Sequence, residues 1–233
     1  MTPEISSHFT LDAWADDIAT RLAETLAVAL SETGRALFAG AGGRTPAPIY
    51  ARLSQAELDW SQVTATLVDE RYVPEASPDS NAAAMKRDLI TGPASAATFV
   101  PLYTPQVTVD RAAAVAAQAL AGARLDAVLL GMGEDGHICS MFPESPTLRT
   151  LLTPTLAPTV LGVPHGRDGM APTIERLSLN LPYLIQARRV VLALRGVEKR
   201  AVFEHEATGD PAIQPIAAMI AANVPLEIVW TEA

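Results

Sequence analysis

Residues 125–137 read "LDAVLLGMGEDGH", an apolar run that stops abruptly at a stretch with three glycines, two acids and a histidine. A short continuous apolar run that ends at glycine is typical of a strand buried on both faces, as in a parallel sheet. Polar groups directly behind such a strand lie at the carboxyl edge of the sheet, where open α/β folds bind their ligands. The stretch therefore predicts an α/β fold with a functional site at this edge.

The rest of the chain alternates in the same way between strand-like and helix-like segments. Apolar runs predict further strands at 35–40, 63–70, 159–163, 176–181, 188–194 and 225–230. Helical spacing predicts helices at 11–31, 47–55, 80–90, 109–123, 197–207 and 215–222, the third of them capped by Ser80 or Asn81. This alternation predicts a three-layer, Rossmann-like, mostly parallel sheet with helices on both faces and a small additional strand region. We expect residues 1–233 to form a single α/β domain.

Composition excludes several classes of function. A net charge of −9 argues against a nucleic-acid binder, because such a chain cannot neutralise phosphates along a duplex. Cys139 is the only cysteine, which excludes an internal disulfide and fits a reducing compartment. No signal-peptide pattern and no long uncharged apolar segment is present, so we expect a cytoplasmic protein without a membrane partner.

A glycine-rich turn, "GAGGRTP", follows the strand at 35–40. Glycines between a strand and a helix let backbone N–H groups approach an anion, and the helix N-terminus favours negative charge there. Thr45 can add a hydroxyl donor. The alternative is a turn that only reverses the chain.

Basic residues follow other predicted strands. Arg71 in "DERYVP" offers a planar fork suited to phosphate or carboxylate, although a surface ion pair with Asp69 or Glu70 is the alternative. Lys199 is expected about one turn into a helix, where it either reaches a phosphate or belongs to a solvated helix face. Arg167 and Arg176 flank a proline-rich stretch and could close over an anion.

The histidine of the opening stretch, His137, is the strongest candidate for chemistry. Neutral imidazole is the natural base for activating water near pH 7, and Asp135 or Glu134 can orient it. The neighbouring glycines are expected to clear space for a substrate. The alternative is a structural histidine that caps a following helix. A metal is not expected, because no second histidine lies at ligand spacing. Cys139 is interpreted as a small core residue.

Taken together, these stretches resemble the 6-phosphogluconolactonase family. The family's hallmarks are "SGGSTP", "DERYVP", "SN" opening a helix, "GMGEDGHTASLFP", an arginine before an "LTLP"-like stretch and a late "G-x-x-K". This chain has, in the same order, "AGGRTP", "DERYVP", "SN", "GMGEDGHICSMFP", "RLSLNLP" and "GVEK". The resemblance implies hydrolysis of 6-phospho-D-glucono-1,5-lactone to 6-phospho-D-gluconate, in the oxidative pentose phosphate pathway, without a cofactor or a metal.

The resemblance also implies roles for single residues. His137 corresponds to the general base that takes a proton from the attacking water, with Asp135 beside it. The substrate's phosphate or lactone oxygens would be held by Gly42, Gly43, Thr45, Arg71 and Lys199. Asp69 and Arg176 match motif positions, and Arg44 stands where the family usually has serine, as an added phosphate contact or a crowding side chain. The expected partner is a small phosphorylated sugar lactone, bound by a monomer or a homodimer.

Two other functions remain as alternatives. Glucosamine-6-phosphate deaminases are similar in the glycine loop and in "DGH", but they typically carry "DEY" and "DGHIAFNEP", where this chain has "DERY" and "DGHICSMFPES". A non-catalytic sugar-phosphate sensor would be expected to lose the base, whereas His137 is present here.

Overall fold

The computed structural model describes residues 3–106, 108–166 and 170–233. Its main sheet has seven strands in the order β1-β10-β9-β6-β2-β3-β5, and all the pairings between them are parallel. These strands are β1 (Ile5–His8), β2 (Ala36–Gly40), β3 (Val63–Leu67), β5 (Thr98–Phe99), β6 (Ala127–Leu130), β9 (Arg189–Arg195) and β10 (Leu226–Thr231). A second, antiparallel sheet has the order β4-β8-β7, formed by β4 (Asp69–Arg71), β8 (Arg176–Leu179) and β7 (Val160–Val163).

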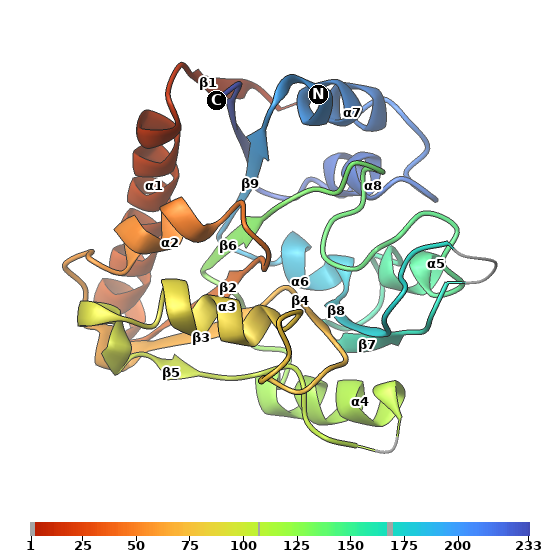
Figure 1. The fold of residues 1–233 in the computed structure, drawn as a ribbon, viewed down its shortest axis with the longest axis horizontal. Coiled ribbons are helices and arrows are strands. Elements are labelled where there is room, and N and C mark those ends of the chain that lie inside the picture. Colours follow the sequence, from red (N-terminus) through yellow and green to blue (C-terminus); the bar gives the residue numbers. More distant parts are fainter. Residues whose placement is uncertain (1–2, 107, 167–169) are drawn as a thin grey trace.

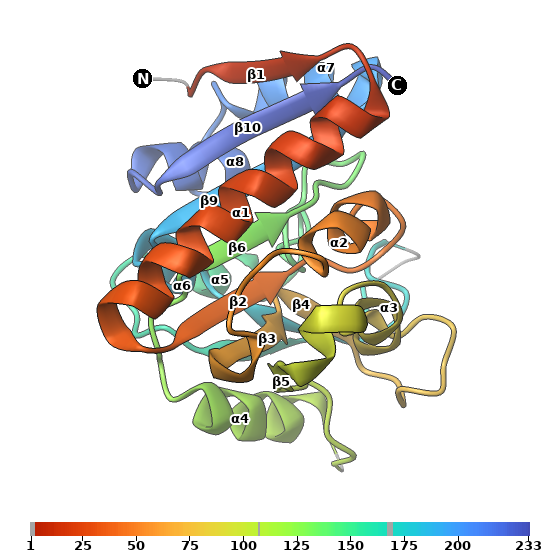
Figure 2. The same cartoon turned by 90° about the vertical axis from the view of Figure 1, so that its left-hand side faces the viewer.

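Helices surround the main sheet, as the sequence predicted (Figure 1). They are α1 (Leu11–Thr33), α2 (Ala47–Leu53), α3 (Asn81–Asp88), α4 (Val109–Leu120), α5 (Leu148–Leu151), α6 (Leu181–Ile185), α7 (Val197–Glu206) and α8 (Pro215–Ala221), with short 3₁₀ helices at Trp60–Gln62 and Gly92–Ala96. The long helix α1 crosses one face of the sheet, and α6 and α8 lie on the other (Figures 1 and 2). The three-layer α/β class with a small extra strand region is therefore confirmed. The boundaries of a single domain over residues 1–233 stay a prediction.

Two predicted strands are wrong in their extent. The strand predicted at 176–181 is shorter, because β8 ends at Leu179 and helix α6 begins at Leu181. Residues 63–70 were expected to form one strand, but β3 ends at Leu67 and β4 begins at Asp69 in the other sheet. Val68 is the crossing point, because its N–H donates to Gly40 O in the main sheet at 3.0 Å, while its carbonyl accepts from Leu179 N at 3.0 Å in the small sheet. An apolar run does not reveal such a change of partner strand, since Val68 is buried just as most residues of β3 before it are.

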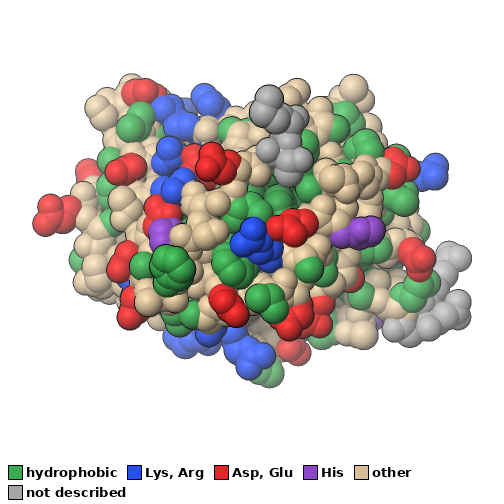
Figure 3. Space-filling view, turned by 90° about the horizontal axis from the view of Figure 1, so that it is seen from above, with side chains coloured by type: hydrophobic (Ala, Val, Ile, Leu, Met, Phe, Trp, Pro, Cys, Tyr) green, Lys and Arg blue, Asp and Glu red, His purple; other side chains and the backbone are tan. Residues whose placement is uncertain are grey.

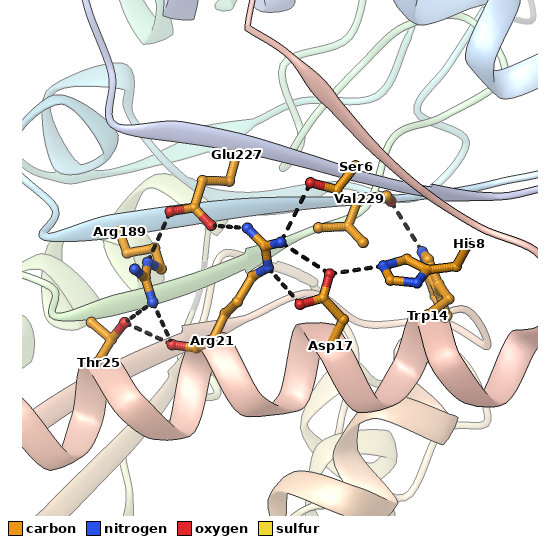
Figure 4. Close-up of polar contacts among 9 residues, drawn as sticks. All are labelled: Ser6, His8, Trp14, Asp17, Arg21, Thr25, Arg189, Glu227 and Val229. Carbon is orange, nitrogen blue, oxygen red and sulfur yellow. Dashed lines mark hydrogen bonds and ion pairs between the residues drawn. The ribbon is translucent and has the colours of Figure 1, made fainter.

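Helix α1 is fixed to the edge of the sheet by a polar network as well as by apolar packing (Figure 4). Asp17 accepts from Arg21 Nε at 2.8 Å and lies 2.8 Å from the Nε2 atom of His8 on β1. Arg21 also donates to Glu227 of β10 at 2.8 Å. Strand β1 was not predicted, because its residues "ISSH" form no apolar run. This network together with the pairing to β10 holds the strand in place.

The carboxyl ends of the strands of the main sheet share one edge, because these strands are parallel. In Figure 2 the arrows of β10, β6 and β2 point to the same side, where α2 and α3 also lie. Acidic side chains are scattered over the face seen from above and are not gathered into one patch (Figure 3). Among the described helices, none is long and apolar enough to cross a membrane.

Candidate active site

A cavity of about 270 Å³ opens where the predicted motifs meet. Of the expected site residues, it is lined by Gly42, Gly43, Arg44, Thr45, Asp69, Arg71, His137, Arg176 and Lys199. Asp135 and Glu134 are not among its lining residues. The cavity is thus lined by segments from distant parts of the chain, namely the glycine loop, β4, β8, the segment after β6 and the start of α7.

His137 is held in a tight turn behind β6. Its Nδ1 lies 2.5 Å from Asp135 Oδ1, and its carbonyl accepts from Gly133 N at 2.8 Å. The pKa of Asp135 is lowered: burial alone would raise it, but the hydrogen bond and the charge of His137 outweigh that effect. An ionised carboxylate only accepts hydrogen bonds, so in the neutral ring Nδ1 carries the proton and Nε2 presents its lone pair.

Two neighbours fix the plane of the imidazole. The Phe142 ring centroid lies 4.2 Å from that of His137 at a tilt of 39°. Gly133 lies against the ring edge, where a Cβ would come within 2.2 Å of Nδ1. The glycines were expected to clear space for a substrate; Gly131 and Gly133 line the cavity, and Gly133 also leaves room for the imidazole itself. The next described helix after His137 is α5, which begins only at Leu148, so His137 does not cap a following helix.

The two glycines of the loop after β2 serve different purposes. Gly43 has φ +84, a left-handed conformation that favours glycine, and a Cβ there would meet nothing within 4 Å. At Gly42 the constraint is space, since a Cβ added there would lie 1.9 Å from Asn81 Oδ1. Arg44 is exposed at this loop and lines the cavity.

Arg71 and Arg176 are direct partners across β4 and β8. Like charges placed opposite each other on an antiparallel pair are destabilising, and burial together with the charge of Arg71 lowers the pKa of Arg176. The Arg176 guanidinium lies 5.6 Å from the Phe142 ring centroid. The nearby carboxylate of Asp69 offsets part of this repulsion. Such a pairing is suited to binding an anion.

Asp69 and Glu70 do not form the surface ion pair considered from the sequence. Asp69 is buried, and its Oδ2 accepts from Ser140 Oγ at 2.6 Å. Glu70 is wholly buried and accepts from backbone N–H groups. The two carboxylates therefore make buried structural hydrogen bonds beside the cavity.

Lys199 lies in the first turn of α7, as expected, but it is not on a solvated helix face. Its Nζ donates to Met132 O at 2.6 Å, which places it beside the segment that carries His137. Burial lowers the pKa of Lys199, and the charges of Glu134 and Asp135 oppose that shift.

Sequence reasoning missed three residues of the site. Asn81 and Phe142 line the cavity, and the carbonyl of Met132 holds Lys199. The signal for Asn81 was present in the "SN" motif, which was assigned only to the start of a helix. Cys139 is buried, as expected of a core residue, although it also touches the cavity. Arg167 lies outside the described residues.

Comparison with known proteins places this geometry in context. The family described as glucosamine-6-phosphate isomerases/6-phosphogluconolactonase matches residues 10–230. A protein of Rhizobium meliloti named 6-phosphogluconolactonase is 41% identical, with 94% of this chain and 93% of that protein covered. A protein of the same name from Pseudomonas aeruginosa is 38% identical, with 93% and 90% covered.

Solved structures agree with the sequence comparison. The crystal structure of a 6-phosphogluconolactonase from Shewanella baltica is 31% identical, with a TM-score of 0.90 over 98% of this chain and 97% of that one. A monomeric glucosamine-6-phosphate deaminase shares the fold, with a TM-score of 0.74 at 16% identity over 98% and 97% of the two chains. Since the family match spans nearly all of the sequence, and relatives well above 30% identity cover nine-tenths of it, the chain belongs to the glucosamine-6-phosphate isomerase/6-phosphogluconolactonase family.

Proposed function

We propose that this protein hydrolyses 6-phospho-D-glucono-1,5-lactone to 6-phospho-D-gluconate, the lactonase step of the oxidative pentose phosphate pathway. The observation that carries the proposal is the pairing of Asp135 with His137 at 2.5 Å, on a cavity that cationic side chains also line. The names of the relatives at 36–41% identity support the lactonase over the deaminase within this family. The single cysteine fits the cytoplasm as the site of this reaction, and the monomer or homodimer stays a prediction.

In the proposed mechanism, Nε2 of His137 takes a proton from a water molecule, whose oxygen attacks the lactone carbonyl carbon. Asp135 stabilises the imidazolium that forms. The carbonyl π bond opens to an oxyanion, which a cavity cation or a loop N–H stabilises. The oxyanion then re-forms the carbonyl π bond as the bond from the carbonyl carbon to the ring oxygen breaks, and the imidazolium gives its proton to that ring oxygen. The product acid ionises to the carboxylate.

A lactone needs no stronger nucleophile than this water. It is already an activated acyl compound, so positioning and one base are sufficient. The buried Cys139 fits this view, because burial raises the pKa of its thiol well above the usual range and disfavours the thiolate. The phosphate is proposed to lie among Arg44, Arg71, Arg176 and Lys199, with N–H groups of Gly42, Gly43 and Thr45 as further donors.

The decisive experiment measures loss of 6-phosphogluconolactone with and without the purified protein, against spontaneous hydrolysis. The proposal expects a rate far above the spontaneous one. Ammonia release from glucosamine 6-phosphate, measured in parallel, tests the deaminase. A protein that binds 6-phosphogluconate but accelerates neither reaction would be a sensor.

Replacing Asp135 by asparagine is expected to lower kcat by about 100-fold, because the imidazole loses the partner that sets its orientation and tautomer. Steady-state kinetics across the pH range measures this effect. An unchanged kcat in the Asp135→Asn variant would contradict the assigned role.

The same substitution has a pH-dependent effect on stability. The folded pKa of Asp135 is lowered from 3.8, so the carboxylate stabilises the fold above that pH and loses its contribution as the pH falls through the folded pKa. The unfolding free energies of wild type and Asp135→Asn should therefore differ at neutral pH and converge when the pH falls below the usual pKa range of aspartate. Urea titrations at several pH values test this convergence.

A further inference from the structure

Three walls of the cavity meet at one buried amide, that of Asn81. The Asn81 side chain is only 3% exposed, and it lines the cavity from the first residue of α3. Its Nδ2 donates to Asp69 O at 2.9 Å, and its Oδ1 accepts from Arg71 Nη1 at 2.8 Å. On its third side it lies against Gly42, where only glycine leaves room for it. One side chain thus joins the glycine loop, β4 and α3.

A second buried group fixes Asn81 itself. Oε1 of Glu70 accepts from the backbone N–H of Arg71 at 2.7 Å and of Asn81 at 2.8 Å, and Oε2 accepts from Ala82 N at 2.7 Å. The carboxylate therefore clamps the end of β4 to the first turn of α3. Because backbone atoms form this clamp, Asn81 and Arg71 keep a fixed relative position.

The contacts of Arg71 show which of its donors remain for a ligand. Nη1 is occupied by Asp79 O and by Asn81 Oδ1, both at 2.8 Å. Within the described part of the chain, Nη2 has no acceptor, and Nε is buried without one. Buried donors normally have a partner, so the orphaned Nε indicates where an acceptor belongs.

The free donors share one edge of the guanidinium. Nε–H and one N–H of Nη2 run parallel, which matches two oxygens of a phosphate better than the single oxygen of a lactone carbonyl. A neutral amide at position 81 is suited to holding Nη1, because it leaves the positive charge of Arg71 for the ligand. A carboxylate there would form an ion pair with it.

We propose that Asn81 is a positioning residue for phosphate recognition. By holding Nη1, it turns the Nε–Nη2 edge of Arg71 towards the phosphate of the substrate. This inference rests on the proposed function for the identity of the substrate, and on the contacts above for the role of Asn81.

A double-mutant cycle tests whether Asn81 acts through Arg71. In the Asn81→Ala variant we expect KM for 6-phosphogluconolactone to rise about tenfold with a much smaller change in kcat, because phosphate binding is uniform to ground and transition states. In an Arg71→Ala background, the same substitution should change KM by less than about twofold, since coupled residues are not additive. Additive effects would overturn the proposal.

Ser80→Ala is the matched control. Ser80 precedes Asn81 and caps α3 through Ala83 N at 3.2 Å, but it makes no contact with Arg71 among the described hydrogen bonds. We expect this variant to lower the thermal midpoint and to leave KM unchanged. A rise in KM equal to that of Asn81→Ala would assign the effect to a loosened helix and overturn the positioning role.

Binding of inorganic phosphate, measured by calorimetry, separates this proposal from the proposed function. If wild type fails to accelerate lactone hydrolysis, the proposed function fails, but the binding test still applies. Phosphate should bind about tenfold more weakly to Asn81→Ala than to wild type, and Asn81→Ala should cause no further loss in an Arg71→Ala background. Equal phosphate affinities of wild type and Asn81→Ala would overturn the positioning role regardless of catalysis.

Discussion

Replacement of His137 by glutamine is expected to reduce kcat for 6-phosphogluconolactone by about 10³-fold, within the range that general acid–base catalysis supplies. Glutamine fills similar space and keeps hydrogen-bonding capacity, but it cannot take a proton from water. The residues proposed to bind the phosphate remain in place, so KM should change little. The loss should therefore appear in kcat and in kcat/KM alike.

Stopped-flow measurement of lactone loss, corrected for the spontaneous rate, is the appropriate assay. His205→Gln provides the control, because His205 is exposed on α7 and does not line the cavity. It should retain wild-type rates. If the His137→Gln variant kept most of the wild-type kcat, another group would have to activate the water.

The largest effect on stability is expected at Glu70. Its carboxylate accepts from three backbone N–H groups and from Ser80 Oγ at 3.2 Å, while the side chain is wholly buried. Glu70→Ala leaves these donors without an acceptor, and each such buried group costs about 1–3 kcal/mol. We expect a loss of about 3 kcal/mol or more in the free energy of unfolding, measured by urea denaturation.

Glu75→Ala is the control for the Glu70→Ala variant. Glu75 forms an exposed ion pair with Lys86 at 2.7 Å, and such pairs contribute about 0–1 kcal/mol. Losses of similar size in the two variants would contradict the clamp described for Glu70.

The pH dependence at Glu70 should run opposite to that at Asp135. Burial raises the pKa of Glu70 above 4.5, although the backbone N–H groups of Asn81, Ala82 and Arg71 oppose the shift. A raised folded pKa means that its contribution is largest below 4.5 and declines as the pH rises through the folded value. Comparison of wild type with Glu70→Gln over this range isolates the effect.

The sequence was sufficient for the parallel sheet and for most of the cavity residues, because each motif directly follows a recognisable apolar run. Apolar runs cannot report a change of strand partner, and for this reason the split at Val68 and the pairing of Arg71 with Arg176 were not predicted. Asn81 was missed for a related reason. Its contacts join three separate segments of the chain, and a helix-capping pattern explains the same two letters equally well.

The crossing at Val68 also bears on how the site is assembled. One peptide unit on each side of this residue connects the two sheets, and the same Gly40 carbonyl that receives the Val68 N–H lies at the start of the glycine loop. Strand β4, which carries Arg71, is therefore anchored to the loop through the main chain, with no spacer to act as a hinge. The groups proposed to bind the anion are set in their final arrangement when the chain folds, so little reorganisation energy is left for the substrate to supply.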